Sequence, residues 1–320
     1  MDFQPTQDQR DLRAGVRDLL EGRYGREELR ASVDRAARTG RSVDRELWRE
    51  LGAAGFFALR LPEKEGGVGL GLPEAALVFE EAGRALLPGP LVATHLAAGT
   101  VPGAAEGEAV VTAFDLDKWL VTHLDEADAV LGFPPGPRTG RPVRSADPLT
   151  PLARANWRLH FEASYAAVEG PDLRDEGALL TAALQLGSAL RTVELAVRYA
   201  GEREQFGQPI GGFQAVKHLC AQMLVRAEVA RTAVYAAAVT ADAAEVAAAK
   251  LLADEAAVRN ARDCLQVHGG MGFTWEADVH LHLKRAWVRA EQWRTAAEAQ
   301  EALAAELLLE ALASGGAAGR

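Results

Sequence analysis

The 320-residue chain is 48% hydrophobic, carries a formal net charge of −10 and contains two cysteines. It can bury a substantial core, so general disorder is excluded, and its length suggests two or three domains or one large helical unit. The negative charge argues against binding nucleic acid or an anionic membrane by bulk electrostatics, so an anionic cofactor would need locally placed cations.

Neither the N-terminus nor the cysteines indicate secretion. The opening residues MDFQPTQDQRDLRAGVRDLL scatter charges through the segment, so we expect no signal peptide, and no run of about 18 apolar residues predicts a membrane span. Cys220 and Cys264 are too few for a disulfide framework and lack metal-ligand spacing. We expect a soluble, cytoplasmic protein with buried free thiols and no metal site.

The first 90 residues predict a helical domain. Thr6 and Gln9 have the spacing of a capping box and open an amphipathic helix that extends to about Arg23. A second helix is expected over 43–54, followed by a glycine-rich loop over 66–71. Pro73 suits the first turn of a further helix that ends near Leu86.

Residues 91–171 predict a small, shortened β domain. The β-prone runs are EAVVTAF, KWLVTHL and ADAVLGF, and the segment FPPGPRTGRP between them and the next run predicts a loop. Further on, Trp157, Leu159 and Phe161 alternate as in a half-buried strand.

Residues 172–313 predict an antiparallel helical bundle. Helices are expected over 173–205, 213–240, 243–267 and 276–312, and Asp242 with Glu245 repeats the capping-box spacing at the third. The tail, 314–320, is expected to fray. The predicted fold is therefore mainly α, with a small central β domain.

The stretch GEREQFGQPIGGFQAVKH, residues 201–218, is the first candidate site. Arg203 and Phe206 lie three residues apart and are expected on one face at the end of a helix, where a guanidinium could bind a pyrophosphate and a phenyl ring could contact a heterocycle. Gln214 would offer an amide from the first turn of the next helix. The alternative is a structural joint between two helices with an exposed arginine and a core phenylalanine, which on the pattern alone is the commoner meaning.

The second candidate is CLQVHGGMGFTWE, residues 264–276. Gln266 precedes Gly269 and Gly270, and paired glycines at a helix end permit close approach of a cofactor or of another backbone. The alternative is an ordinary glycine stop of a helix. The histidines that follow lack metal-ligand spacing, and the glycine-rich loop at 66–71 lacks the ending of a phosphate-binding P-loop.

Together these segments resemble the acyl-CoA dehydrogenase family of flavoenzymes. LWRELGAAGFFALRLPEKEGGVGLGLPEAALVFEEAGRAL is similar to the family's N-terminal helical domain. YAGEREQFGQPIGGFQAVKHLCAQM is similar to its R-x-x-F-G-x-x-(I/L)-x-x-x-Q signature, and QVHGGMGFTWE to its Q-x-x-G-G-x-G-(F/Y) segment. The three occur in the family's order and separation over nearly the whole chain.

The resemblance implies an N-terminal helical domain, a β domain and a C-terminal four-helix bundle, assembled as dimers or tetramers. It also implies an acyl-CoA substrate, FAD as cofactor and an electron-transfer flavoprotein as acceptor. In the family, the bundle of one subunit contacts the adenosine diphosphate half of an FAD held mainly by its neighbour. The residues implied to do so here are Arg203, Gln205, Phe206, Gln214, Gln266, Gly269 and Gly270.

The residues implied for the chemistry are harder to find. In the family a carboxylate removes the α-proton of the thioester while the β-hydrogen leaves as hydride to the flavin. The β segment here lacks the E-P-x-x-G-S-D and W-I-T stretches that embrace the flavin ring and the thioester. In place of the family's E-G-T sequence the chain reads KRAWVRAEQWRTAAEAQ, with Glu291 as the nearest carboxylate in what we expect to be a continuous helix. The candidates before the helix leading to Arg203 are Asp172, Asp175 and Glu176, each of which could equally be a helix N-terminal charge.

Three interpretations follow. The leading one is a subunit, resembling the short chain of heteromeric family members that serve fatty-acid or steroid side-chain β-oxidation, which shares an FAD site with a longer subunit. The second is a self-sufficient homomeric dehydrogenase with a displaced base such as Glu291. The third is a helical interaction protein that has lost the flavin.

Overall fold

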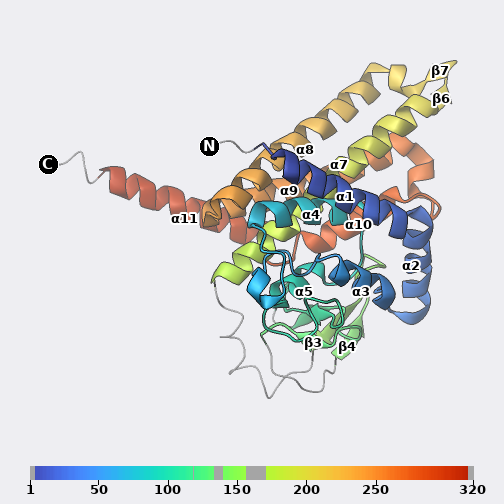
Figure 1. Ribbon diagram of the computed structural model, residues 1–320. Coiled ribbons are helices and arrows are strands. Elements are labelled where there is room, and N and C mark those ends of the chain that lie inside the picture. Colours follow the sequence, from blue (N-terminus) through green and yellow to red (C-terminus); the bar gives the residue numbers. More distant parts are fainter. Residues whose placement is uncertain (1–3, 118, 133–139, 156–170, 316–320) are drawn as a thin grey trace.

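The computed structural model describes residues 4–117, 119–132, 140–155 and 171–315, with side chains from 173 to 309 in the last range. Helices dominate it, with two small sheets at one end and a two-stranded hairpin at the other (Figure 1). The expected strand around Trp157, Leu159 and Phe161 lies outside the described residues, as does most of the predicted loop at 133–142. Gly140 to Pro142, at the end of that loop, belong to a strand instead.

The N-terminal part is helical, as predicted, and contains one helix that the sequence reading missed. The Thr6–Gln9 capping box is present, and Pro73 stands in the first turn of its helix. The missed helix carries a buried face of Leu29, Val33 and Ala36 and ends at Gly40, whose φ of 69° is left-handed. The helices are α1 (Gln7–Arg23), α2 (Arg26–Thr39), α3 (Arg45–Ala53) and α4 (Leu72–Arg84), with a 3₁₀ turn, η1 (Glu63–Glu65), in the predicted loop region.

The region after residue 90 begins with a helix, α5 (Leu91–Ala97), which the expected run of strands did not include. Two small sheets follow: β1 (Val111–Thr112) pairs in parallel with β3 (Ala129–Val130), and β2 (Leu120–Thr122), β5 (Leu152–Ala155) and β4 (Gly140–Val143) form an antiparallel sheet in that order. Each described strand has four residues or fewer. The β layer is therefore small, as expected.

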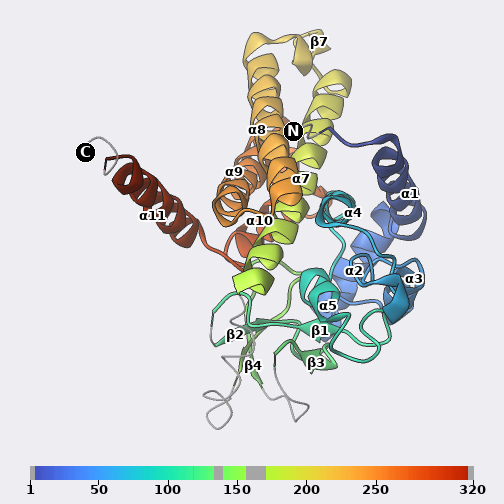
Figure 2. The same cartoon turned by 60° about the vertical axis from the view of Figure 1, so that its left-hand side comes forward.

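The C-terminal part is a bundle in which α7 (Pro171–Glu202), α8 (Gln214–Thr240), α9 (Ala243–His268) and α10 (Val279–Arg289) pack together. Asp242 caps α9 by accepting from the backbone amides of Ala244 and Glu245. The prediction of one helix over 276–312 is wrong, because the helix is interrupted at 290–295. Trp293 there has a φ of 62°, which no α-helix tolerates. After the break, α11 (Ala296–Gly315) extends from the bundle as a separate arm (Figures 1 and 2).

Close contact between α4 and α7 fixes the N-terminal helices against the bundle. A Cβ atom added to Gly187 would lie 1.8 Å from the carbonyl oxygen of Glu80, and one added to Gly83 would lie 2.0 Å from that of Leu184. Only glycine permits backbones to approach this closely. The close approach therefore fixes the position of α4 against α7.

Candidate functional site

The first predicted segment forms a β-hairpin at the free end of the bundle. Helix α7 ends at Glu202, and the strands β6 (Glu204–Gln205) and β7 (Gln208–Pro209) pair around a two-residue turn. Phe206 and Gly207 have φ values of 55° and 79°, as a type I′ turn requires. The prediction that Arg203 and Phe206 share a helix face is therefore wrong. The backbone groups of β6 and β7 form hydrogen bonds between the two strands and do not continue the helix.

The hairpin leaves its predicted residues open to solvent. Phe206 is 92% exposed and meets Phe213 edge to face, with ring centroids 6.0 Å apart. The guanidinium of Arg203 has no hydrogen bond or ion pair among the described residues, whereas the amide of Gln205 donates to the carbonyl of Glu204 at 2.7 Å. The expectation of a core phenylalanine in a plain structural joint is thus wrong.

The residues predicted beyond the hairpin are also at the surface. Gln214 is the first residue of α8, after a 3₁₀ turn, η2 (Ile210–Gly212), and its Nε2 lies 3.3 Å from Nε2 of His218. Gln266 is exposed in the last turn of α9, which stops at Gly269 with a φ of 58°. A Cβ atom on Gly269 or Gly270 would meet nothing within 4 Å. The glycine pair is therefore both a helix stop and an open backbone surface.

The two segments lie at the same end of the bundle. Tyr199, one turn before Arg203, stacks on His268 at the end of α9 with ring centroids 4.1 Å apart. We call the seven exposed residues the bundle-end cluster: Arg203, Gln205, Phe206, Gln214, Gln266, Gly269 and Gly270.

Large apolar side chains that sequence reasoning did not single out follow the glycine pair of this cluster along the chain. In the 3₁₀ turn η3 (Gly269–Phe273) and just beyond it, Met271 is 55% exposed, Phe273 75% and Trp275 49%. Phe273 occupies the F/Y position of the glycine motif, so the motif could have indicated it as a candidate site residue. Exposed apolar groups gathered this way mark a surface that a ligand or a partner covers.

The predicted carboxylate lies elsewhere in the fold. Glu291 is exposed in the break between α10 and α11, where its amide donates to the carbonyl of Val288 at 3.1 Å. The break ends in the sequence Trp293-Arg294-Thr295, which matches the family's E-G-T pattern only at the threonine. Thr295 and Glu298 cap α11 by accepting from each other's amides.

Trp293 fills the space beside the start of α7. It is 5% exposed, its amide donates to the carbonyl of Asp115 at 2.5 Å, and a Cβ atom added to Gly177 would lie 2.3 Å from its indole ring. A bulky ring, two residues after Glu291, thus occupies this buried space.

The alternative carboxylates near the start of α7 have cationic partners. Asp175 accepts from Arg294, and Glu176 accepts from Arg60. His95 lies 3.8 Å from Glu176, but burial lowers the pKa of its imidazole to about 4, so the ring is neutral at pH 7. The side chain of Asp172 lies outside the described ones.

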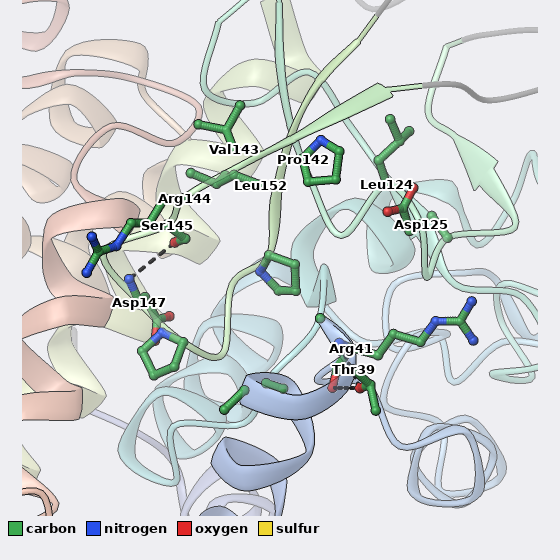
Figure 3. A pocket seen from close by; sticks show the side chains of 16 residues that line it. Thr39, Arg41, Leu124, Asp125, Pro142, Val143, Arg144, Ser145, Asp147 and Leu152 are labelled. Atoms are coloured by element: carbon green, nitrogen blue, oxygen red, sulfur yellow. Dashed lines mark hydrogen bonds between the residues drawn. The ribbon is translucent and has the colours of Figure 1, made fainter.

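A cavity of about 1150 Å³ opens between the end of α2 and the small sheets, far along the chain from the bundle-end cluster (Figure 3). Thr39 and Arg41 border it on one side and Pro142 to Ser145 on the other. None of the predicted site residues lines it. Among the described residues, no helix is long and apolar enough to cross a membrane.

Comparisons with known proteins agree with this architecture. The acyl-CoA dehydrogenase N-terminal domain matches residues 6–108, and the acyl-CoA dehydrogenase C-terminal domain matches residues 175–314. The chain is 36% identical to the acyl-CoA dehydrogenase IpdE2 of Mycobacterium tuberculosis, covering 95% of this chain and 98% of that protein.

Solved structures show the same fold. The structure of the ChsE4-ChsE5 complex of Mycobacterium tuberculosis matches with a TM-score of 0.82 at 26% identity, over 96% of this chain and 99% of that one. Butyryl-CoA dehydrogenase from Megasphaera elsdenii matches with a TM-score of 0.82 at 22% identity, over 96% of this chain and all of that one. With a full-length relative, two matching domains and the same helical architecture, the chain belongs to the acyl-CoA dehydrogenases, a family of FAD-dependent flavoenzymes.

Proposed function

We propose that this chain is a subunit that takes part in FAD-dependent α,β-dehydrogenation of an acyl-CoA thioester and contributes the bundle-end cluster to an FAD site shared across a subunit interface. The observation that carries the proposal is the exposure of all seven cluster residues at one end of the bundle. A cation without a partner, an aromatic ring and open glycine backbone are the groups that a pyrophosphate and its nucleoside need.

The cluster fits the adenosine diphosphate half of FAD. Arg203 would bind the pyrophosphate, because its guanidinium has no partner among the described residues. Gln214 and Gln266 would donate amide hydrogen bonds, and Gly269 and Gly270 leave room for a phosphate or a neighbouring backbone. When bound, FAD supplies the hydride acceptor for the reaction.

A partner that holds the reactive half of the flavin explains the remaining features. The sequence lacks the two family stretches that embrace the flavin ring, and Trp293 occupies the space beside Gly177. The similar structure is that of a complex between ChsE4 and ChsE5. We therefore propose a hetero-oligomer with a longer acyl-CoA dehydrogenase subunit. It would act in the β-oxidation of a fatty acid or steroid side chain and pass electrons to an electron-transfer flavoprotein.

A second candidate, a homomeric enzyme with Glu291 as base, is favoured by one observation: Glu291 lies in a helix break rather than within a helix, so its direction is not fixed by helix geometry. Purifying the chain alone and with a longer homologue separates the two. A yellow complex and a colourless lone chain are expected. A lone chain with stoichiometric FAD that bleaches with acyl-CoA would favour the homomeric enzyme, and a flavin-free complex would favour a helical interaction protein.

Arg203→Ala tests the cluster directly. Loss of a charge-assisted contact worth about 1.5–3 kcal/mol should weaken FAD retention by the complex roughly 10- to 150-fold, measured by fluorescence of released flavin. The matched control is Arg259→Ala, which removes an exposed arginine paired with Glu255 on α9. Equal FAD affinity in both variants would remove Arg203 from the site.

A further inference from the structure

Buried positive charge gathers where α9 and α10 meet the β layer. Lys250, Arg285 and Arg289 are 0%, 4% and 3% exposed. Two buried carboxylates pair with them: Asp254 accepts from Lys250, and Asp147 accepts from Arg285. Three cations against two paired carboxylates leave an excess of one positive charge. An unpaired buried charge is costly, so a compensating anion is expected close by.

Arg289 is the cation without a carboxylate. Among the described residues its guanidinium makes one hydrogen bond, a long one of 3.4 Å from Nη1 to the carbonyl of Leu184. Burial is the main cause that lowers the pKa of Arg289 well below its usual value, and Arg285 adds to it. Asp147 opposes this shift without cancelling it. Because an arginine stays protonated in proteins, the direction indicates a charge that its surroundings compensate only in part.

Arg285 keeps one buried donor without a hydrogen-bond partner among the described residues. Its Nε donates to Asp147 and its Nη1 to the carbonyl of Leu87, while the buried Nη2 has no partner. The pKa of the neighbouring His282 also reflects this positive charge. Burial is the largest cause and nearby arginines including Arg191 add to it, and together they lower the pKa of the imidazole to about 3. The site therefore disfavours any further positive charge.

A cavity of about 30 Å³ joins these donors. It is bordered by Arg285 and Arg289 of α10, by Gln292 and Trp293 of the helix break, and by Asp115 after β1. Its volume suits one small ion or a carboxylate group and is far too small for a nucleotide. Oδ1 of Asp115 is buried without a partner, and burial raises the pKa of this carboxyl to about 7. Below pH 7 this carboxyl group is mostly protonated and can donate a hydrogen bond to an anion.

We infer that Arg285 and Arg289 form a binding site for a small monoanion, a halide or a carboxylate, in the cavity between α7, α10 and the helix break. The inference concerns this chain's own interior and does not depend on the shared flavin site. The guanidiniums supply the charge and the donors, and the size of the cavity excludes larger anions.

The test uses the full chain with bromide as the probe. Sodium bromide replaces sodium gluconate, an anion too large for the cavity, at constant ionic strength, and the melting temperature is followed. A saturable rise is expected in the wild type. Arg289→Met should raise the bromide concentration at half-saturation at least about tenfold, because a charge-assisted contact is lost. The control Arg259→Met, which removes an exposed partner of Glu255 on α9, should keep the response.

A crystal grown in bromide tests the position without any variant. An anomalous peak in contact with Arg285 and Arg289 supports the site, and a cavity holding only water overturns it, as does an equal thermal response in wild type and Arg289→Met. Succinyl-CoA and butyryl-CoA, which differ in a terminal carboxylate, distinguish the two sources of the anion. Loss of the bromide response with succinyl-CoA alone identifies the carboxylate of an acyl group, and its persistence with both identifies a free ion.

Discussion

The crossing of α4 and α7 makes a sharp prediction for Gly187→Ala. The added Cβ would lie 1.8 Å from the carbonyl oxygen of Glu80 and 2.7 Å from the amide nitrogen of Arg84. Real Cβ atoms do not approach closer than about 3 Å, and both atoms belong to backbone, so no side chain can rotate away. The helices must therefore move apart by about 1 Å along the line of contact.

The magnitude follows from two opposing effects. Replacing glycine by alanine inside a helix contributes about 1 kcal/mol of helix propensity. Overpacking a tight contact costs typically 1–3 kcal/mol, and a backbone clash of this depth falls at the upper end. We expect a net loss of about 2 kcal/mol, which for a chain of this size lowers the melting temperature by about 3 °C.

Differential scanning calorimetry of the wild type, Gly187→Ala and Gly201→Ala measures this. Gly201 lies in the same helix, and a Cβ atom there would meet nothing within 4 Å, so its replacement should stabilise by up to about 1 kcal/mol. Opposite signs for one substitution in one helix are the expected result. Equal shifts for the two variants would refute the close approach of α4 and α7.

Two further predictions concern buried charge. Lys250→Met should lower the free energy of unfolding, measured by urea titration, by about 3–5 kcal/mol because it leaves Asp254 buried without its cationic partner. The double variant Lys250→Met with Asp254→Leu should lose less than the single variant, and a larger loss would contradict this reasoning. The pKa of His282 falls from 6.5 in the unfolded chain to about 3 in the fold. Its contribution to stability is therefore fully present above pH 6.5 and is lost as the pH falls towards 3. His282→Gln should show a smaller drop in urea midpoint between pH 7.5 and pH 5 than the wild type, and equal drops would remove His282 as a cause.

The sequence predicted the helical elements best where local signals were strong. The capping residues Thr6 and Asp242 and the helix-starting Pro73 lie where expected, because cap and first-turn preferences depend on neighbouring residues alone. The break at Trp293 was missed, because alanine-rich sequence on both sides favours a continuous helix. Long-range contacts with Asp115 and Gly177 hold the turn instead.

For the candidate site, motif order indicated which residues to propose but not their geometry. The R-x-x-F-G and G-G-x-G segments led to the cluster, yet its arginine and phenylalanine were expected on one helix face and lie in a hairpin. The turn signal was present in Phe206-Gly207, where glycine accepts a positive φ, but helix periodicity was the stronger pattern. The exposure of Phe206 depends on how the whole bundle ends, which no local pattern shows.

By itself, the sequence determined the family, the order of helices and β layer, and the residues implied to hold FAD, since these depend on motif identity, periodicity and caps. Only the tertiary structure decided which charges are buried together. Asp147 precedes Arg285 by well over a hundred residues, yet the two form a buried ion pair. Arg285 and Arg289 in turn border one small cavity. Charge compensation in a low-dielectric interior is a property of distances in space, and those distances arise only when the helices pack.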